Sequence, residues 1–386
     1  MSLVQQRQVL CVVGARPNFM KIAPIMRAFR APELGLRATL LHTGQHYDAA
    51  MKHAFFEQLD IPEPDIDLGV GSGSHALQTA EIMQRFEPVL DRERPDVVLV
   101  VGDVNSTIAC ALVAVKKGIP VVHVEAGLRS GDRSMPEEIN RVLTDQLSEL
   151  LFTTERDAER NLAREGIDPA RVHFVGNVMI DTLRHNLTRA TPAARTLREA
   201  GLDAAEGEYG LVTLHRPSNV DDPARLRALL ELLAECSEQL PLVFPVHPRT
   251  ASRIAEAGLE PVLERGRILR LDPLGYLEML GLMRSARLVL TDSGGIQEET
   301  TALGVPCLTL RENTERPITI EEGTNTLVGT RPECIRAAFD ETLRSGGKAG
   351  RVPPLWDGCA AERIAAILSD WLHGTAPADT GRRERA

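Results

Sequence analysis

Short apolar runs alternate with longer amphipathic stretches along most of the chain. The apolar runs are rich in β-branched residues and end at turn residues, which is typical of strands buried in a parallel sheet. In the first half they read VLCVVG, ATLLHTG, DVVLVVGD, PVVHVEAG, LLFTT and VHFVGN. Helical periodicity lies between them, for example over residues 19–29, 74–90 and 106–117. Strands that alternate with helices predict βαβ units and a doubly wound α/β sheet.

The same pattern predicts a second unit in the C-terminal half. It weakens over residues 185–207, which we interpret as a connecting helix and a linker, and restarts with YGLVTLH, PLVFPVH, RILRL, ARLVLTD and VPCLTL. Two such domains place the carboxyl ends of two sets of strands at a cleft, where α/β proteins bind ligands. We therefore predict Rossmann-like domains over 1–185 and 186–360. A helix over 361–373 is expected to cross back to the first domain, and a disordered tail over 374–386.

Composition narrows the class of protein. The chain has 386 residues, 43% of them hydrophobic, and a net charge of −10, which argues against a general nucleic-acid or membrane-surface binder but allows a local basic pocket. No apolar run approaches the roughly 20 residues of a membrane span, and the N-terminus has no signal-peptide pattern. The six cysteines are scattered without a C-x-x-C pair, which favours reduced thiols and a cytoplasmic protein.

A polar turn, GARPNFMK, follows the first predicted strand. It carries one glycine, Gly14, where the fingerprint G-x-G-x-x-G requires three, so we expect no bound NAD. Arg16 and Lys21 bracket the turn as it enters a helix, an arrangement that suits an anionic group. Both are equally well explained as solvated surface cations, and position alone does not decide between the two interpretations.

Acidic residues follow neighbouring strands of the predicted first sheet. Asp103 ends one strand, Glu125 lies just beyond the next, and Glu137 opens a helix after Pro136. Taken singly, each has an ordinary explanation as a helix cap or a first-turn acid. Because the carboxyl ends of parallel strands meet at one edge of a sheet, the combination predicts a carboxylate cluster there.

Histidine–arginine pairs follow two strands of the predicted second sheet. His215 with Arg216, and His247 with Arg249, are candidate anion contacts, although a single histidine is more often structural. The chain has no H-E-x-x-H or H-x-H pattern, so no metal site is expected. Ser293 lies in TDSGG and not in the G-x-S-x-G of a nucleophile elbow, which argues against a serine hydrolase.

The stretch LVLTDSGGIQEET, residues 288–300, predicts a nucleotide site. A diphosphate can lie on the amides of Ser293, Gly294 and Gly295 at a helix N-terminus. Two acids, Glu298 and Glu299, follow in what we expect to be the first turn, where their charge would repel a phosphate. A carboxylate there can instead accept hydrogen bonds from both hydroxyls of a ribose. The alternative is that the acids only complement the helix dipole.

Taken together, these motifs resemble those of the non-hydrolysing UDP-N-acetylglucosamine 2-epimerases. The resemblance runs from about residue 9 to residue 372. It is carried by G-A-R-P-x-x-x-K, T-G-Q-H, G-D-x-x-S-T, H-V-E-A-G-L-R, P-E-E-I-N-R, P-V-H-P, D-S-G-G-I-Q-E-E and E-N-T-E-R-P. It implies a glycosyltransferase-B-like fold with two Rossmann-like domains facing a cleft, a homodimer, a UDP-sugar substrate and no redox cofactor.

Site residues follow from the resemblance position by position. Asp103, Glu125 and Glu137 match the catalytic carboxylates, and His215 matches a histidine near the diphosphate. The remaining matches are substrate-binding residues: Arg16, Lys21, His247, Ser293, Gly294, Gly295, Glu299 and Arg316. The implied reaction converts UDP-GlcNAc to UDP-ManNAc by eliminating UDP and adding it back to a 2-acetamidoglucal.

Two departures from the family pattern keep alternatives open. HRPSN (215–219) replaces the H-R-R-E-N of many members, and TGQHYDAA (43–50) lacks the pattern of members activated allosterically by substrate. TGQHYD and GSGSH are similar to UDP-2,3-diacetamido-glucuronate epimerases, for which Arg133 is a candidate contact to the extra carboxylate, whereas TERP is similar to the plain GlcNAc enzymes. A hydrolysing epimerase, a glycosyltransferase and a non-catalytic nucleotide-sugar sensor are further alternatives.

Overall fold

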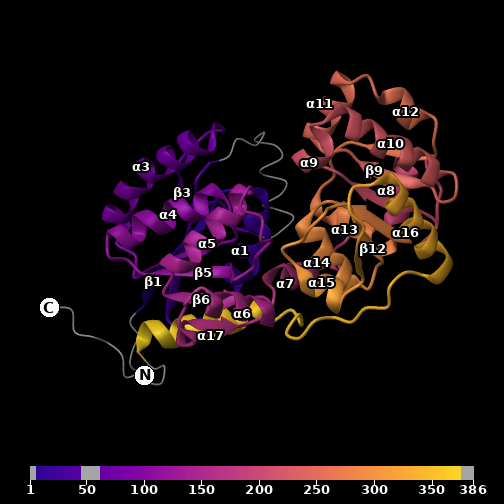
Figure 1. Ribbon diagram of the computed structural model, residues 1–386. Helices are drawn as coiled ribbons and strands as arrows, with labels where there is room; N and C mark the ends of the chain where they lie inside the picture. The colour runs from indigo at the N-terminus through magenta and orange to yellow at the C-terminus, as the bar shows by residue number, and fades with distance from the viewer. Residues whose placement is uncertain (1–5, 45–60, 375–386) are drawn as a thin grey trace. The chain divides into compact units, whose positions relative to one another are not determined.

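The computed structural model describes residues 6–44 and 61–374 (Figure 1). The chain divides into two compact units, Met1–Thr182 with Pro354–Ala386, and Leu183–Pro353. Each unit is a parallel sheet with helices on both faces (Figure 1). Most of the tail predicted to be disordered, and the motif residues 45–50, lie outside the described residues.

The first unit contains a seven-stranded parallel sheet in the order β3-β2-β1-β4-β5-β6-β7. Its centre is the doubly wound order of a Rossmann fold, because β1 and β4 are neighbours and the chain winds outward from them in both directions. The strands are β1 (Arg7–Val13), β2 (Leu36–His42), β3 (Ile66–Asp67), β4 (Val97–Val101), β5 (Val121–Ala126), β6 (Leu150–Thr153) and β7 (Val172–Phe174).

Helices cover this sheet because strand residues buried on both faces need apolar partners. Alternate residues of the strands, such as Leu10 and Val12, pack with α3 and α4 in one core cluster. The helices that lie within the unit are α1 (Arg16–Ala28), α3 (His75–Glu93), α4 (Asn105–Lys116), α5 (Pro136–Leu147), α6 (Arg156–Arg164) and α17 (Ala360–His373). Helix α7 (Val178–Asn186) spans the division between the units.

The C-terminal helix α17 is part of the first unit, where it packs against α1 (Figure 1, yellow). The carboxylate of Asp181 caps its N-terminus by accepting hydrogen bonds from the N–H groups of Ala360 (3.2 Å) and Ala361 (2.7 Å). Trp356, fully buried ahead of the helix, donates to the carbonyl of Thr154 at 3.0 Å. The end of the chain is therefore fixed to the first unit at several points.

The second unit contains a six-stranded parallel sheet in the order β10-β9-β8-β11-β12-β13. The strands are β8 (Gly210–Thr213), β9 (Leu242–Pro245), β10 (Ile268–Leu271), β11 (Leu288–Thr291), β12 (Cys307–Thr309) and β13 (Asn325–Leu327). Leu211 and Val212, adjacent on β8, belong to two different core clusters, one on each face of the sheet. The second sheet is therefore doubly wound like the first.

Helices cover both faces of the sheet in the second unit. They are α8 (Ala193–Glu199), α9 (Pro217–Val220), α10 (Pro223–Ser237), α11 (Pro248–Glu256), α12 (Glu260–Glu264), α13 (Tyr276–Ser285), α14 (Gly294–Leu303), α15 (Pro317–Glu321) and α16 (Pro332–Ser345). Among the described residues, none of the helices has both the length and the apolar character that spanning a membrane requires.

The predicted linker over residues 185–207 was wrong in part. Helix α8 lies within it and packs with α13, and Leu197 is fully buried in a core cluster with Tyr209 and Leu282. The segment is therefore part of the second unit's core. All eleven strands predicted from apolar runs are present, while β3 and β13, of two and three residues, are too short to produce a run.

Candidate active site

A buried ion pair lies at the carboxyl end of β5 in the first unit. The Nζ of Lys21, on α1, is 2.7 Å from Oε1 of Glu125, and their side chains are only 7% and 2% exposed. Glu125 has a φ of +72°, and the pairing register of β5 shifts between Val124 and Ala126. A non-glycine residue in this left-handed region costs on the order of 1 kcal/mol or more, and such strain is concentrated at functional sites.

The same ammonium group lies against the turn that follows β4. A Cβ added to Gly102, which has a φ of +66°, would lie 2.9 Å from Nζ of Lys21. Glycine therefore allows the cation to approach the backbone directly before Asp103. The carboxylate of Asp103 accepts a hydrogen bond from Nη1 of Arg141 at 2.9 Å, and its carbonyl accepts one from Asn140. Lys21, Asp103 and Glu125 thus lie at one edge of the sheet.

Helix α5 presents two adjacent glutamates in different environments. Glu138 is buried, accepts hydrogen bonds from the N–H groups of Ser130 (3.0 Å) and Gly131 (2.9 Å), and forms a 2.9 Å ion pair with Arg141. Burial acts to raise the pKa of Glu138, but these contacts outweigh it and lower the pKa. Glu137 is half-buried and forms no hydrogen bond or ion pair with any residue that the structure describes. Glu138 is thus bound in structural contacts, and Glu137 is available to a ligand.

Asn18 orders the GARP turn and was missed by the sequence analysis. Its Oδ1 accepts from the N–H groups of Gly14 (3.2 Å) and Ala15 (2.9 Å), and its Nδ2 donates to the carbonyl of Val101 (3.0 Å). It therefore connects the turn after β1 to the end of β4. No capping signal in the sequence indicated this role, because the N-cap residue of α1 is Ala15 and not the serine or threonine of a capping box. Arg16 is the first residue of α1, and its side chain lies outside the described part of the structure.

In the second unit, the turn between β11 and α14 is the candidate anion seat. The helix begins at Gly294, Ser293 makes no side-chain cap, and the first turn contains no acidic residue. A Cβ added to Gly294 would lie 2.8 Å from Nη1 of Arg316 and 2.8 Å from Oε1 of Glu315, so this ion pair lies over the start of the helix. Backbone N–H groups at a helix start beside a buried arginine are donors of the kind that bind a phosphate or diphosphate.

The two glutamates of this motif lie in the second turn of α14, so the expectation that they occupy the first turn was wrong. Because α14 starts only at Gly294, neither lies among the amides at its N-terminus. Glu298 forms a 2.8 Å ion pair with Nε of Arg316, and both side chains are buried. Glu299 is 4% exposed and accepts a 2.9 Å hydrogen bond from the hydroxyl of Tyr276. The two adjacent acids therefore contact different side chains, Glu298 that of Arg316 and Glu299 that of Tyr276.

Glu315 holds three arginines together behind this seat. Its carboxylate, 4% exposed, is 2.7 Å from Nη1 of Arg316, 2.8 Å from Nη2 of Arg311 and 3.6 Å from Nη2 of Arg216. Burial acts to raise the pKa of Glu315, but the three guanidinium groups lower it far below its ordinary value. Glu315 is therefore the common partner of the three guanidinium groups.

His215 is oriented by a buried carboxylate. Its Nδ1 lies 3.1 Å from Oδ1 of Asp292, which is fully buried and also accepts from the backbone N–H groups of His215 and Arg216. Asn219 donates to the same carboxylate at 3.1 Å. The ring of His215 is 35% exposed and lies 5.6 Å, between centroids, from that of His247, which caps α11.

Several of these partners were not found in the sequence. They are Asp292, Asn219, Tyr276, Arg311 and Glu315 in the second unit, and Arg141 and Asp145 in the first. Asp292 was detectable, because it directly follows a strand in TDSGG. Tyr276 was not, because it is brought to Glu299 from a helix that carries no motif.

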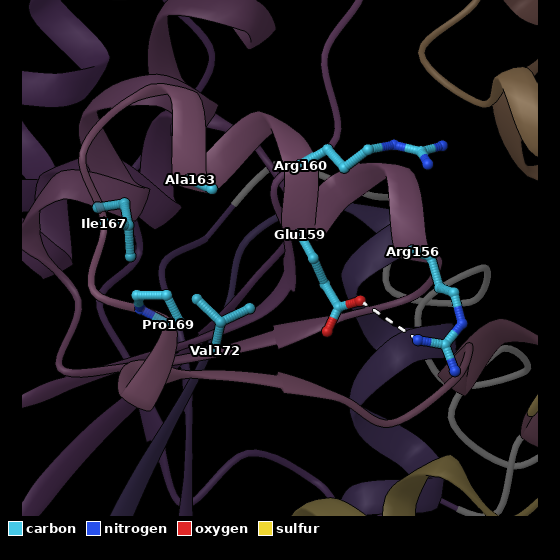
Figure 2. A pocket seen from close by; sticks show the side chains of 7 residues that line it. All are labelled: Arg156, Glu159, Arg160, Ala163, Ile167, Pro169 and Val172. Atoms are coloured by element: carbon cyan, nitrogen blue, oxygen red, sulfur yellow. Dashed lines mark ion pairs between the residues drawn. The ribbon is translucent and has the colours of Figure 1, made fainter.

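A separate surface pocket contains none of the predicted site residues (Figure 2). It has a volume of about 370 Å³ and lies along α6, where Arg156 and Glu159 form a 3.9 Å ion pair. Its lining residues are Arg156, Glu159, Arg160, Ala163, Ile167, Pro169 and Val172. Within the described residues, no group of three or more histidine, cysteine or acidic side chains is placed to hold a metal ion.

Comparisons with known proteins agree with this arrangement. A family model described as UDP-N-acetylglucosamine 2-epimerase matches residues 30–369. The chain is 43% identical to the UDP-N-acetylglucosamine 2-epimerase of Methanocaldococcus jannaschii, over 93% of this chain and 98% of that protein. It is 42% identical to the UDP-2,3-diacetamido-2,3-dideoxy-D-glucuronate 2-epimerase of Pseudomonas aeruginosa, over 94% and 99% respectively.

A solved structure gives the same result for the fold. The crystal structure of the M. jannaschii UDP-GlcNAc 2-epimerase in complex with UDP-GlcNAc and UDP matches with a TM-score of 0.86 and covers 94% of this chain and 99% of that one. This confirms the predicted glycosyltransferase-B-like fold. The family model covers most of this sequence, and the relatives named above match this chain over almost their whole length. The chain therefore belongs to the UDP-N-acetylglucosamine 2-epimerase family of enzymes.

Proposed function

We propose that this enzyme interconverts UDP-GlcNAc and UDP-ManNAc by inverting C2 of the sugar. The observation that carries the proposal is the group of Lys21, Asp103 and Glu125 at one sheet edge, where Lys21 pairs with Glu125 and Arg141 pairs with Asp103. The M. jannaschii relative, 43% identical, bears this name and was crystallised with UDP-GlcNAc and UDP. The anion seat of the second unit supports a UDP-sugar as the substrate.

The reaction is an elimination followed by an addition. The C2 proton is not adjacent to a carbonyl, so its direct removal would leave an unstabilised carbanion. Instead, a base removes the C2 proton while the C1–O bond to UDP breaks, which gives 2-acetamidoglucal with a C1=C2 double bond and free UDP. A proton then adds to C2 from the opposite face, and a phosphate oxygen of UDP re-forms the bond to C1. Electrons and protons balance without a redox cofactor.

We infer that the second unit stabilises the departing UDP. Negative charge develops on the diphosphate as the C1–O bond breaks, and fixed donors stabilise such charge most effectively. The amides of Gly294 and Gly295, with the guanidinium of Arg316, supply these donors. His215, held by Asp292, is a further donor. Glu299 is suited to accept hydrogen bonds from the ribose hydroxyls.

We infer that the first unit moves the protons. Each positioned acid or base contributes about 10²- to 10⁴-fold to such a step. Glu125 is paired with Lys21, and Asp103 is paired with Arg141. Glu137, half-buried and without such a partner among the described residues, completes the set of three.

A second substrate is supported by one comparison. The P. aeruginosa relative, whose name specifies UDP-2,3-diacetamido-2,3-dideoxy-D-glucuronate, is only one percentage point less identical than the M. jannaschii enzyme. That substrate carries a C6 carboxylate, which needs a cation. Arg133 is exposed and forms no ion pair with any described residue.

The experiment is a comparison of kcat/KM for the two UDP-sugars with the wild-type enzyme and with Arg133→Gln. We expect higher kcat/KM for UDP-GlcNAc and no effect of Arg133→Gln on it. A higher kcat/KM for the UDP-diacetamido-glucuronate, lowered selectively by Arg133→Gln, would identify that sugar and not UDP-GlcNAc as the substrate. Release of free ManNAc with UDP would identify a hydrolysing enzyme.

We also propose a homodimer that uses α3, α4 and α5. The N-terminal ends of these helices are joined through Asn105, which hydrogen-bonds to Gln78 at 2.8 Å and to Asn140 at 3.4 Å. Large apolar side chains nearby are exposed: Leu77 by 70% and Ile139 by 45%, together with Leu143 by 48%. Exposed apolar side chains grouped on adjacent helices are typical of a surface that packs against a partner.

A further inference from the structure

A fully buried histidine connects the two turns that carry Asp103 and Glu125. His123 lies on β5, two residues before Glu125, and is 0% exposed. Its Nε2 is 2.8 Å from the carbonyl oxygen of Gly102, the residue before Asp103. Its Nδ1 is 2.6 Å from Oδ1 of Asp145, on α5.

The ring and the carboxylate are each held by a second partner. A backbone carbonyl only accepts hydrogen bonds, so Nε2 of His123 donates to Gly102. Oδ2 of Asp145 accepts from the N–H of Gly127 (3.1 Å) and from Nη2 of Arg129 (2.6 Å). The pair is therefore fixed at both ends.

The pair lies in a region of ion pairs. Arg129 donates to Asp145 and also forms two hydrogen bonds to Glu165, at 2.8 and 2.7 Å. Lys21 pairs with Glu125, and Arg141 pairs with both Asp103 and Glu138. The side chains around the two turns therefore hold one another in place.

The His123–Asp145 pair holds both catalytic turns at once. The ring fixes the carbonyl of Gly102, directly before Asp103, and the carboxylate fixes the N–H of Gly127, two residues after Glu125. Both glycines have positive φ, +66° and +79°, so the turns depend on these contacts to keep one conformation. Displacement of a catalytic group by about 1 Å can cost roughly 10²-fold in rate.

We propose that His123 is a positioning residue that, with Asp145, sets the spacing between the carboxylates of Asp103 and Glu125. The proposal rests on the proposed function for the role of those carboxylates. His123 itself exchanges no proton with the substrate.

The positioning role is tested by kinetics. We expect His123→Gln and Asp145→Asn to lower kcat by about 10- to 100-fold while UDP affinity stays unchanged, because UDP is assigned to the second unit. His173→Gln is the matched control, since His173 is half-buried on β7 and contacts neither turn. Normal kcat in both variants would overturn the positioning role. If the wild-type enzyme epimerises neither UDP-sugar, the proposed function fails, whereas normal kcat in both variants beside an active wild-type enzyme overturns only the positioning role.

Discussion

In two places of this enzyme, adjacent glutamates contact different groups, and the sequence alone does not tell the two residues of a pair apart. Glu137 and Glu138 are equivalent in the sequence, yet Glu138 is bound to two N–H groups and Arg141. Likewise Glu298 pairs with Arg316 while Glu299 contacts Tyr276. Successive helical side chains diverge by about 100°, so neighbours meet different surroundings. The sequence indicated which short segments matter but not which of two neighbours acts, because that depends on partners from distant segments.

The first prediction concerns the carboxylates of the first unit. Asp103→Asn and Glu125→Gln should each lower turnover by at least about 10²-fold, because each removes a positioned proton-transfer group. UDP binding, measured by calorimetry, should be largely kept. Asp96→Asn is the matched control, because Asp96 precedes β4, contacts Arg7 and Gln8, and should leave turnover unchanged. Near-normal turnover in both site variants would refute the assignment.

The second prediction concerns the ribose. Glu299→Ala should weaken UDP binding by about 10-fold, because hydrogen bonds to a charged group contribute roughly 1.5–3 kcal/mol. Tyr276→Phe removes the hydroxyl that contacts Glu299 but keeps the carboxylate, so it should weaken binding less. Calorimetry with UDP distinguishes the two variants. Equal UDP affinity in wild type and Glu299→Ala would exclude the diol contact.

At the level of elements, the sequence was most informative where strands end. Apolar runs located eleven strands, and the polar residues after them lie at the sheet edges as expected for parallel sheets. The short strands β3 and β13 were not predicted, and the helix expected within 185–207 was not predicted to pack into a core. Their positions are set by tertiary packing and not by local pattern, which is also why Asn18 and Glu315 appeared only in the structure.

The third prediction concerns the capped end of α17. Burial, opposed by the N–H groups of Ala361 and Ala360, raises the pKa of Asp181 from 3.8 to about 6. Between these values the folded protein keeps a proton that the unfolded chain has lost, so the free energy of unfolding falls as the pH rises through this window. The stabilisation is fully present below about pH 4, amounts to at most about 3 kcal/mol, and is lost above about pH 6.

Asp181→Asn should remove this pH dependence, because an amide does not titrate. Both tryptophans of the chain, Trp356 and Trp371, lie in this C-terminal segment, so fluorescence-detected denaturation at pH 4.5 and 7 reports on it directly. The stability of wild type relative to the variant should decrease from the lower to the higher pH. A constant difference between the two proteins would show that Asp181 titrates normally.

At the scale of the whole molecule, two units with doubly wound sheets carry different side chains at their strand ends. The first contains carboxylates paired with cations, and the second contains a helix N-terminus beside buried arginines. We propose proton transfer for the first and nucleotide binding for the second, since function depends on the side chains placed at strand ends.

The fourth prediction concerns assembly. Ile139→Lys with Leu143→Lys should convert a dimer into a monomer of 42.3 kDa, because charged side chains oppose burial of that helix face. Sedimentation equilibrium measures the mass. Val352→Lys, also at an exposed apolar residue but in the second unit, is the control and should leave the dimer intact. A monomeric wild-type enzyme, or dimeric Ile139→Lys/Leu143→Lys, would contradict this surface.

The most direct test of the proposed chemistry is proton NMR of the enzyme with UDP-GlcNAc in D₂O. Elimination and re-addition require the C2 proton to leave and a solvent-derived hydron to return. UDP-ManNAc should therefore form with deuterium at C2, and deuterium should also enter C2 of the remaining UDP-GlcNAc. Formation of UDP-ManNAc that retains the original C2 proton would contradict the elimination mechanism, and the absence of any new sugar would contradict the proposed substrate.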